Sequence, residues 1–93
     1  MRNYEVALIV RPEAEHLAEG KEYLKNLFGS AGCKVLKEED MGNRELAYEI
    51  KKSKRGHYLV YELEAGPETV KVLEKSLKMR NEILKCMVYR KEG

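Results

Sequence analysis

The sequence predicts an α+β domain in which two helices cover one face of a four-stranded antiparallel sheet. Three observations support this prediction. Apolar residues alternate with period two in some segments, which indicates strands. They recur at helical spacing in two other segments, which indicates helices. These segments follow the order strand, helix, strand, strand, helix, strand. A proline stands at the expected start of each helix, where its missing N–H leaves no hydrogen bond unmade.

The first element is a strand over residues 4–11, rich in valine, leucine and isoleucine. Four apolar side chains share one of its faces: Tyr4, Val6, Leu8 and Val10. The other face still carries Ala7 and Ile9, and apolar residues on both faces are typical of a central strand.

A helix is predicted from Pro12 to the neighbourhood of Gly32, which we expect to cap its C-terminus. Acidic residues stand in its first turn, where the positive end of the helix dipole favours them. Its apolar stripe consists of Leu17, Leu24, Leu27, Phe28 and Ala31. Gly20 lies beside this stripe and would allow close packing against the sheet.

The second strand is predicted to begin at Lys34 and to continue through the stretch 41–52. Gly42 and Asn43 interrupt it and could form either a hairpin turn or a bulge within one long strand. We favour the bulge, because the flanking segments are not two matched apolar strands. Two residues on one side of this stretch are expected to pack against other side chains: Leu46 and Tyr48.

A basic loop over residues 53–56 is predicted to lead into a third strand over residues 57–65. The loop is short, so this strand should pair with the second in antiparallel orientation. Four residues of one face are expected to point toward the helices: His57, Leu59, Tyr61 and Leu63. Two of those on the other face are Tyr58 and Val60.

The second helix is predicted to begin at Pro67 and to end near Arg80, with Asn81 in a left-handed cap conformation. The last strand is predicted over residues 83–89. Seven side chains are assigned to the core: Val6, Leu8, Leu24, Leu46, Leu63, Leu73 and Leu77.

Right-handed crossovers would place both helices on one face of the sheet. This is the split βαβ, ferredoxin-like arrangement βαββαβ, and we expect residues 1–93 to form it as a single domain. The opposite sheet face would then lack a helix. It is predicted to show Ile9, Tyr58 and Val60, more apolar surface than a solvated face requires.

The net charge of +2 is small but unevenly distributed. Residues 1–50 carry 7 Lys and Arg against 10 Asp and Glu, whereas residues 51–93 carry 11 against 6. A focused basic surface can bind phosphates even when the total charge is modest. The small total predicts few phosphate contacts, and therefore help from a second molecule.

No segment approaches the roughly 18 apolar residues that a membrane-spanning helix needs. Cys33 and Cys86 are far apart and form no C-x-x-C motif, so we expect buried, unreactive thiols rather than a redox or metal pair. These features predict a cytoplasmic protein.

Catalytic chemistry has little support in the sequence. His16 is expected to be exposed on the first helix, and His57 is expected to be structural or to face RNA. There is no glycine-rich phosphate loop and no metal-ligand spacing. We therefore predict no enzyme activity, no metal and no cofactor; a small ferredoxin-like enzyme would depend on His57 or Cys86.

Residues 55–62 partly resemble the third-strand signature of RNA-recognition-motif domains, K/R-G-F/Y-G/A-F-V-x-F/Y. Arg55, Gly56 and Val60 match, but only Tyr58 is placed to stack on a base. A free-standing module that binds single-stranded RNA on its open sheet face is therefore the alternative hypothesis.

Residues 42–51 read G-N-R-E-L-A-Y-E-I-K and resemble the signature of the bacterial small-subunit ribosomal protein S-six (S6) family. That signature is Gly, any residue, a cation, a polar residue, Leu-Ala-Tyr, any residue, Ile and a polar residue. The resemblance extends along the whole chain, from Tyr4 to the basic end of the last strand. Glu49 stands where the signature often has proline. Some members carry a long acidic tail, and we do not expect one here.

The resemblance implies a ferredoxin-like fold and a structural, non-enzymatic role in the small ribosomal subunit, with a ribosome-associated location in the cytoplasm. It also implies binding to the central domain of small-subunit ribosomal RNA, with ribosomal protein S-eighteen (S18) as heterodimer partner. Six cations are the candidate RNA-phosphate contacts: Arg2, Arg44, Arg80, Lys85, Arg90 and Lys91. Five residues are the candidates for the protein partner: Arg44, Ala47, Glu49, Tyr58 and Val60.

Overall fold

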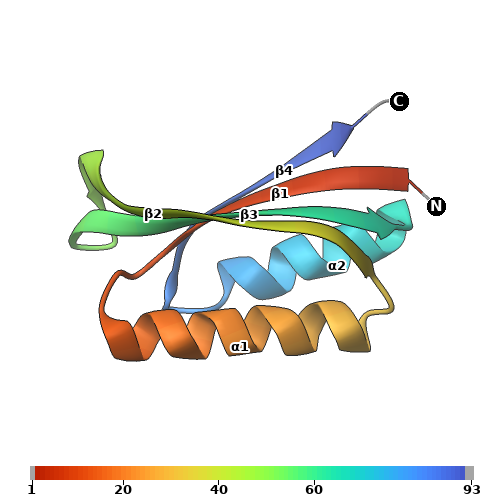
Figure 1. Cartoon of the computed structure of the whole chain (residues 1–93), viewed down its shortest axis with the longest axis horizontal. Helices are drawn as coiled ribbons and strands as arrows, with labels where there is room; N and C mark the ends of the chain where they lie inside the picture. The colour runs from red at the N-terminus through yellow and green to blue at the C-terminus, as the bar shows by residue number, and fades with distance from the viewer. Residues whose placement is uncertain (1, 92–93) are drawn as a thin grey trace.

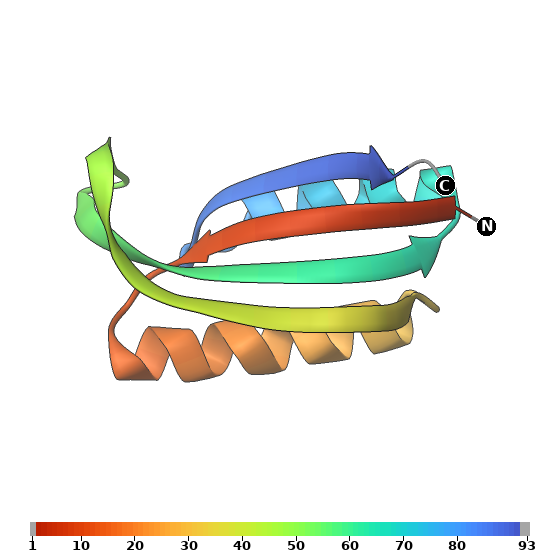
Figure 2. The same cartoon turned by 45° about the horizontal axis from the view of Figure 1, so that its top comes forward.

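The computed structural model describes residues 2–91 and contains the six elements in the predicted order (Figure 1). The strands are β1 (Arg2–Val10), β2 (Lys34–Ile50), β3 (Ser53–Ala65) and β4 (Ile83–Lys91), and the helices are α1 (Ala14–Ser30) and α2 (Pro67–Lys78). The strands form one antiparallel sheet in the order β2-β3-β1-β4. Figure 2 shows β1 and β3 in the middle of the sheet and β2 and β4 at its edges.

Both helices lie on the same side of the sheet, and no helix formed by residues 2–91 covers the other side (Figure 1). The ferredoxin-like prediction is therefore confirmed. The core fills the space between the sheet and the helices, and its fully buried side chains include Val6, Leu8, Leu24, Phe28, Leu59, Leu63, Leu73 and Leu77. Phe28 of α1 meets Tyr61 of β3 edge to face, with 5.2 Å between ring centroids.

Two glycines of the α1 region act as predicted. Gly32 has φ +75°, its N–H donates to the carbonyl of Gly29, and the N–H of Cys33 donates to the carbonyl of Phe28. This pair of bonds is the Schellman cap that ends the helix. Gly20 is buried, and a Cβ added there would lie 3.0 Å from Cγ1 of Val10, so α1 packs on β1 at van der Waals distance.

The favoured bulge is confirmed. β2 is one strand of 17 residues, and its register against β3 shifts between Asp40 and Gly42. Gly42 adopts φ +84° at the bulge. Glycine reaches this conformation without the steric cost that a Cβ would bring. A second shift lies between Val35 and Lys37, and a third precedes Ile50.

The predicted loop over residues 53–56 is wrong, because these residues open β3. The chain instead reverses at Lys51 and Lys52, with φ of +47° and +65°, between the paired residues Ile50 and Ser53. A type I′ hairpin turn, one of the two-residue turns that match strand twist, requires positive φ at both central positions, which usually selects Asn or Gly. Two lysines occupy these positions here, so the residue types did not indicate a turn.

The left-handed cap predicted at Asn81 is also wrong. Within residues 2–91, the non-glycine residues with positive φ are Lys51 and Lys52. After α2, the N–H groups of Met79 and Arg80 donate to carbonyls three residues earlier, at 3.3 Å each. The helix therefore ends by tightening its last turn, without a left-handed residue.

The packing predicted for Leu46 and Tyr48 is only partly correct. Leu46 is half-buried on the uncovered side of the sheet and does not belong to the core between sheet and helices. Tyr48 is 65% exposed. Both lie in the part of β2 that extends past β1, whose pairing with β3 reaches only His57. No helix lies against this extension (Figure 1).

Candidate nucleic-acid and protein interface

The uncovered face of the sheet brings together residues from all four strands. Strand pairing places Tyr58, Ile9 and Lys85 in one row across β3, β1 and β4. Arg44 of β2 lies beside this row, and its guanidinium carbon is 5.7 Å from the centroid of the Tyr58 ring. This is cation–π distance, so Arg44 and Tyr58 act as one unit at the β2 side of the face.

The middle of this face is apolar. Val60, Ala7 and Met87 form the next row across β3, β1 and β4. Beyond them Tyr89 is 52% exposed, and its hydroxyl donates to the sulfur of Met87 at 3.4 Å. A strip of this composition is typical of the centre of a protein–protein interface, where aromatic and methionine side chains are enriched.

Ile9 does not contribute to this exposed strip, contrary to expectation. It is 4% exposed because Gly56, on the neighbouring strand, leaves room for it. A Cβ at position 56 would overlap Cγ2 of Ile9 and would also contact Leu46. The half-buried Leu46 is thus part of a small cluster on the uncovered face.

Lys91 lies on the same face but is already paired. Its Nζ donates to the Glu62 carboxylate at 2.7 Å, and both side chains are solvent-accessible. This hydrogen bond holds the pKa of Glu62 below its usual value and the pKa of Lys91 above it. Binding of a phosphate by Lys91 would compete with Glu62.

Arg80 lies elsewhere, in the connection between α2 and β4. Its Nε donates to Glu82 at 2.6 Å, and its guanidinium carbon is 4.2 Å from the ring centroid of Tyr23 on α1. Glu82 is 7% exposed, so its charge requires this partner. Arg80 therefore joins α1 to the start of β4.

The remaining candidates occupy two other regions. Arg2 and Arg90 are exposed at the ends of β1 and β4, where side-chain alternation directs them to the helix side of the sheet. Ala47 and Glu49 are exposed in the irregular end of β2. The structure therefore gathers Arg44, Tyr58, Val60, Lys85 and Lys91 on one face and leaves the other candidates apart from it.

A set of hydrogen bonds fastens the tip of the β2–β3 hairpin to the body of the domain. Arg11 donates from Nη2 to the carbonyl of Lys51 at 3.1 Å and from Nε to the carbonyl of Asn81 at 3.0 Å. Lys51 donates from Nζ to the carbonyl of Ile83 at 2.8 Å. Sequence reasoning missed these contacts, because the partners are 32 to 70 residues apart.

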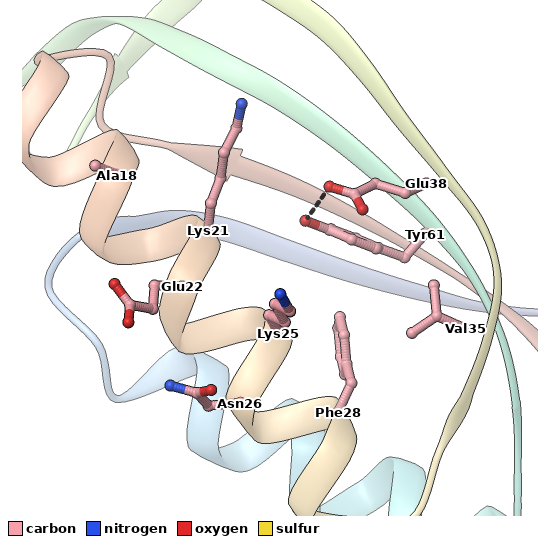
Figure 3. A pocket seen from close by; sticks show the side chains of 9 residues that line it. All are labelled: Ala18, Lys21, Glu22, Lys25, Asn26, Phe28, Val35, Glu38 and Tyr61. Carbon is pink, nitrogen blue, oxygen red and sulfur yellow. Dashed lines mark hydrogen bonds between the residues drawn. The ribbon is translucent and has the colours of Figure 1, made fainter.

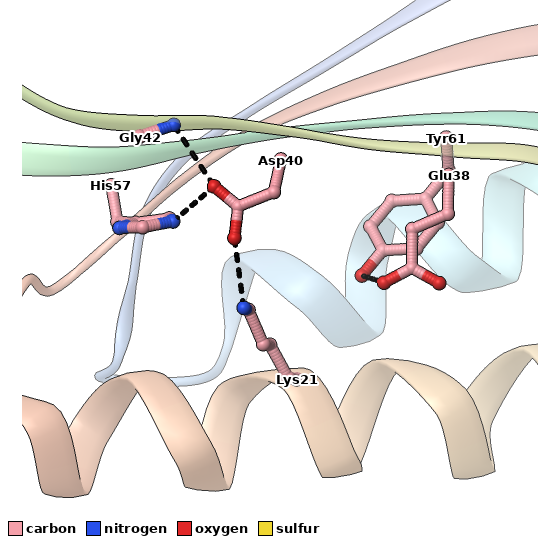
Figure 4. Close-up of polar contacts among 6 residues, drawn as sticks. All are labelled: Lys21, Glu38, Asp40, Gly42, His57 and Tyr61. Carbon is pink, nitrogen blue, oxygen red and sulfur yellow. Dashed lines mark hydrogen bonds and ion pairs between the residues drawn. The ribbon is translucent and has the colours of Figure 1, made fainter.

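The bulge in β2 is held by a second polar cluster, shown in Figure 4. The Asp40 carboxylate accepts from Nζ of Lys21 and from the N–H of Gly42, each at 2.9 Å, and contacts Nε2 of His57 at 2.5 Å. The Lys21 hydrogen bond contributes most to lowering the pKa of Asp40 to about 2. His57 thus has a structural partner, which its sequence position did not indicate.

A groove of about 800 Å³ lies between α1 and β2 (Figure 3). Phe28, Val35 and the Tyr61 ring form its apolar part. The Tyr61 hydroxyl donates to Glu38 at 3.4 Å, and burial raises the pKa of Tyr61 above its usual value. The charges along the groove are mixed, with lysines on α1 and acids on both elements, so it favours no charged ligand of one sign.

The cysteine thiols are free and half-buried, and burial raises the pKa of Cys86 to about 11 and that of Cys33 above its usual value. Thiols with raised pKa are poor nucleophiles. Within residues 2–91 there is no group of three or more His, Cys, Asp or Glu that could hold a metal ion. Neither helix in this range is long and apolar enough to cross a membrane.

Comparison with known proteins identifies close relatives. The family model described as ribosomal protein S6 matches residues 3–90. The small ribosomal subunit protein bS6 of Deinococcus radiodurans is 32% identical over 90 residues, which cover 95% of this chain and 88% of the relative. The bS6 protein of Treponema denticola is 34% identical over 92 residues, covering 99% of each chain.

Solved structures agree with the sequence relatives. The crystal structure of 30S ribosomal protein S6 from Thermotoga maritima matches with a TM-score of 0.86 at 30% identity, covering 97% of this chain and 87% of that one. The C-terminal domain of the MgtC protein from Mycobacterium tuberculosis matches with a TM-score of 0.68 at 16% identity, and this likeness concerns the fold alone.

Proposed function

The chain belongs to the ribosomal protein S6 family, and from this premise we propose that it binds the central domain of small-subunit ribosomal RNA together with S18. In this role it is a structural component of the small ribosomal subunit in the cytoplasm and catalyses no reaction. The observation that carries the proposal is the family match over residues 3–90. The uncovered sheet face supports it, because that face offers a surface for a partner.

We assign the protein partner to the uncovered face. Arg44 and Tyr58 form its polar side, and Val60 and Met87 lie in its apolar middle. Ala47 and Glu49 would extend the contact along the hairpin. An apolar centre with a polar rim is the usual composition of a specific interface.

We assign the RNA to cations that are free to bind phosphates. Within residues 2–91, no carboxylate lies within 4 Å of the charged groups of Arg2, Arg44, Lys85 or Arg90, whereas Arg80 and Lys91 are paired with acids. The first group should therefore contribute more to affinity than the second. So few contacts fit a protein that shares its RNA site with a partner.

The alternative, a module that stacks single-stranded bases on the open sheet, is less well supported. Arg44 lies over the Tyr58 ring, which is the surface that a base would need. Substitution of Tyr58 by alanine separates the two hypotheses. A stacking module should lose about 1–3 kcal/mol of single-strand affinity in this variant. The proposed function instead predicts that the unsubstituted chain has almost no affinity for single-stranded RNA.

The test of the partner assignment is titration calorimetry of the chain with S18. We expect Tyr58→Ala and Arg44→Ala each to weaken the complex by tenfold or more, about 1.4 kcal/mol. Val72→Ala is the matched control, since Val72 is 63% exposed on α2, in the opposite layer. Equal affinities for all three variants and the unsubstituted chain would place the partner on another surface.

A further inference from the structure

A hollow of about 230 Å³ beside the start of β4 is lined by lysines from three separate elements. Lys51 stands in the β2–β3 turn, Lys78 in the last turn of α2, and Lys85 in β4. The other lining residues are Ile83, Leu84 and Cys86. A water molecule occupies about 30 Å³ in the liquid, so the hollow has room for an anion of several atoms with part of its hydration.

The charge around the hollow is poorly balanced. Nζ of Lys78 is 3.6 Å from the Glu74 carboxylate, and both side chains are exposed. For Lys51 and Lys85, no carboxylate of residues 2–91 lies within 4 Å of the ammonium group. All the charged residues that line the hollow are lysines, so an anion bound there would lie near positive charge and would meet no carboxylate of the lining.

One wall of the hollow is fixed before any ligand arrives. Nζ of Lys51 is held at 2.8 Å by the carbonyl of Ile83, and the backbone of Lys51 is held by Arg11. An ammonium group has three donors, and the bond to Ile83 uses one of them. The others remain for a ligand, and a donor that is already ordered loses little entropy on binding.

We infer that this hollow binds a phosphate group. If the chain binds ribosomal RNA as proposed above, this phosphate belongs to the RNA backbone. Lysine ammonium groups act as point charges without the planar fork of arginine, so they suit a backbone phosphate that carries no sequence information. Lys85 is then one member of a three-lysine site whose other members, Lys51 and Lys78, lie 34 and 7 residues away in the sequence.

The test measures how the affinity for central-domain ribosomal RNA, in the presence of S18, depends on salt. Each phosphate neutralised contributes about 0.7–0.9 to the slope of log K against log salt. We expect Lys51→Gln, Lys78→Gln and Lys85→Gln to lower this slope. Lys75→Gln is the matched control, because Lys75 stands in the same last turn of α2 but does not line the hollow. Slopes equal to that of the Lys75 variant would overturn the assignment to RNA.

A second arm uses inorganic phosphate and follows the backbone amide resonances of Leu84 and Cys86 by NMR. We expect saturable shifts that disappear in Lys51→Gln/Lys85→Gln. Shifts without any change in RNA salt slope would show a free-anion site and refute the RNA assignment, whereas no saturable shift would refute the phosphate site. If the unsubstituted chain with S18 fails to bind the RNA, the proposed function fails, and this arm alone decides whether the hollow binds phosphate.

Discussion

Arg11 donates a hydrogen bond from Nη2 to the carbonyl oxygen of Lys51 at 3.1 Å, and so connects the end of β1 to the turn of the β2–β3 hairpin. The same guanidinium donates from Nε to the carbonyl of Asn81, which lies just before β4 in the sequence. One side chain therefore holds three connections of the fold together. The hairpin tip, and with it the Lys51 ammonium group, is positioned by this residue.

Arg11→Met should loosen the hairpin tip. The variant keeps part of the apolar stem but loses both donors, and charge-assisted hydrogen bonds at a partly exposed site contribute about 1–2 kcal/mol to the free energy of unfolding. We expect faster hydrogen exchange of the amides over residues 51–55. Arg2→Met is the control, since Arg2 is exposed. Unchanged exchange at the tip in Arg11→Met would contradict the role given to this residue.

Lys52→Gly should stabilise the protein. Lys52 has φ +65°, a conformation that costs an L-residue about 1 kcal/mol and glycine almost nothing. We expect a free energy of unfolding higher by up to about 1 kcal/mol in urea denaturation. Lys54→Gly removes the same charge from within β3 and should destabilise instead. A loss of stability in Lys52→Gly would contradict the turn described above.

Gly56→Ala should destabilise the protein, because the added Cβ would overlap Ile9 on the adjacent strand. Overpacking of this kind costs about 1–3 kcal/mol. Gly29→Ala is the control, since a Cβ there meets nothing within 4 Å and alanine favours the helix. Adding Ile9→Ala to Gly56→Ala should recover part of the loss from overlap. Equal thermal stability of Gly56→Ala and the unsubstituted chain would refute the close packing.

Asp40→Asn should change the acid stability of the protein. The pKa of Asp40 is lowered from 3.8 to about 2 in the folded state, so the unfolded chain binds the proton more tightly. Its ionised carboxylate therefore stabilises the fold above the unfolded pKa, and this contribution is lost as pH falls from about 4 to about 2. The Asp40 side chain is 43% exposed, so solvent screening limits the contribution to below about 1 kcal/mol.

The measurement is the free energy of unfolding by urea at several pH values between 5 and about 2. The unsubstituted chain should lose stability more steeply than Asp40→Asn over this interval. Glu39→Gln, on the same strand, controls for removal of an acid and should keep the steep dependence. Parallel curves for the unsubstituted chain and Asp40→Asn would show that Asp40 does not stabilise the fold through this cluster.

The order of elements, the sheet topology and the bulge were predictable from sequence because each follows from local patterns. Strand alternation placed Val6 and Leu63 in the core, and Gly32 marked the end of α1. The hairpin turn was misplaced because Lys51 and Lys52 adopt left-handed conformations that tertiary contacts hold in place. Composition alone favours glycine there.

The candidate site was less predictable, because its members meet only through tertiary structure. Arg44 and Lys85 are 41 residues apart in sequence but lie on the same sheet face. Arg80 and Lys91 are predicted phosphate contacts, and the structure pairs both with acids. Ile9 was expected to be exposed, but a glycine on the next strand allows its burial.

The most direct measurement is the affinity of the chain for a central-domain ribosomal RNA fragment, alone and with equimolar S18, at one fixed salt concentration. Four of the candidate phosphate contacts have no carboxylate partner within residues 2–91, so the chain alone should neutralise few phosphates. We therefore expect weak binding alone and an affinity at least tenfold higher with S18, a coupling of about 1.4 kcal/mol. Tight binding by the chain alone, with no change when S18 is added, would contradict a shared RNA site.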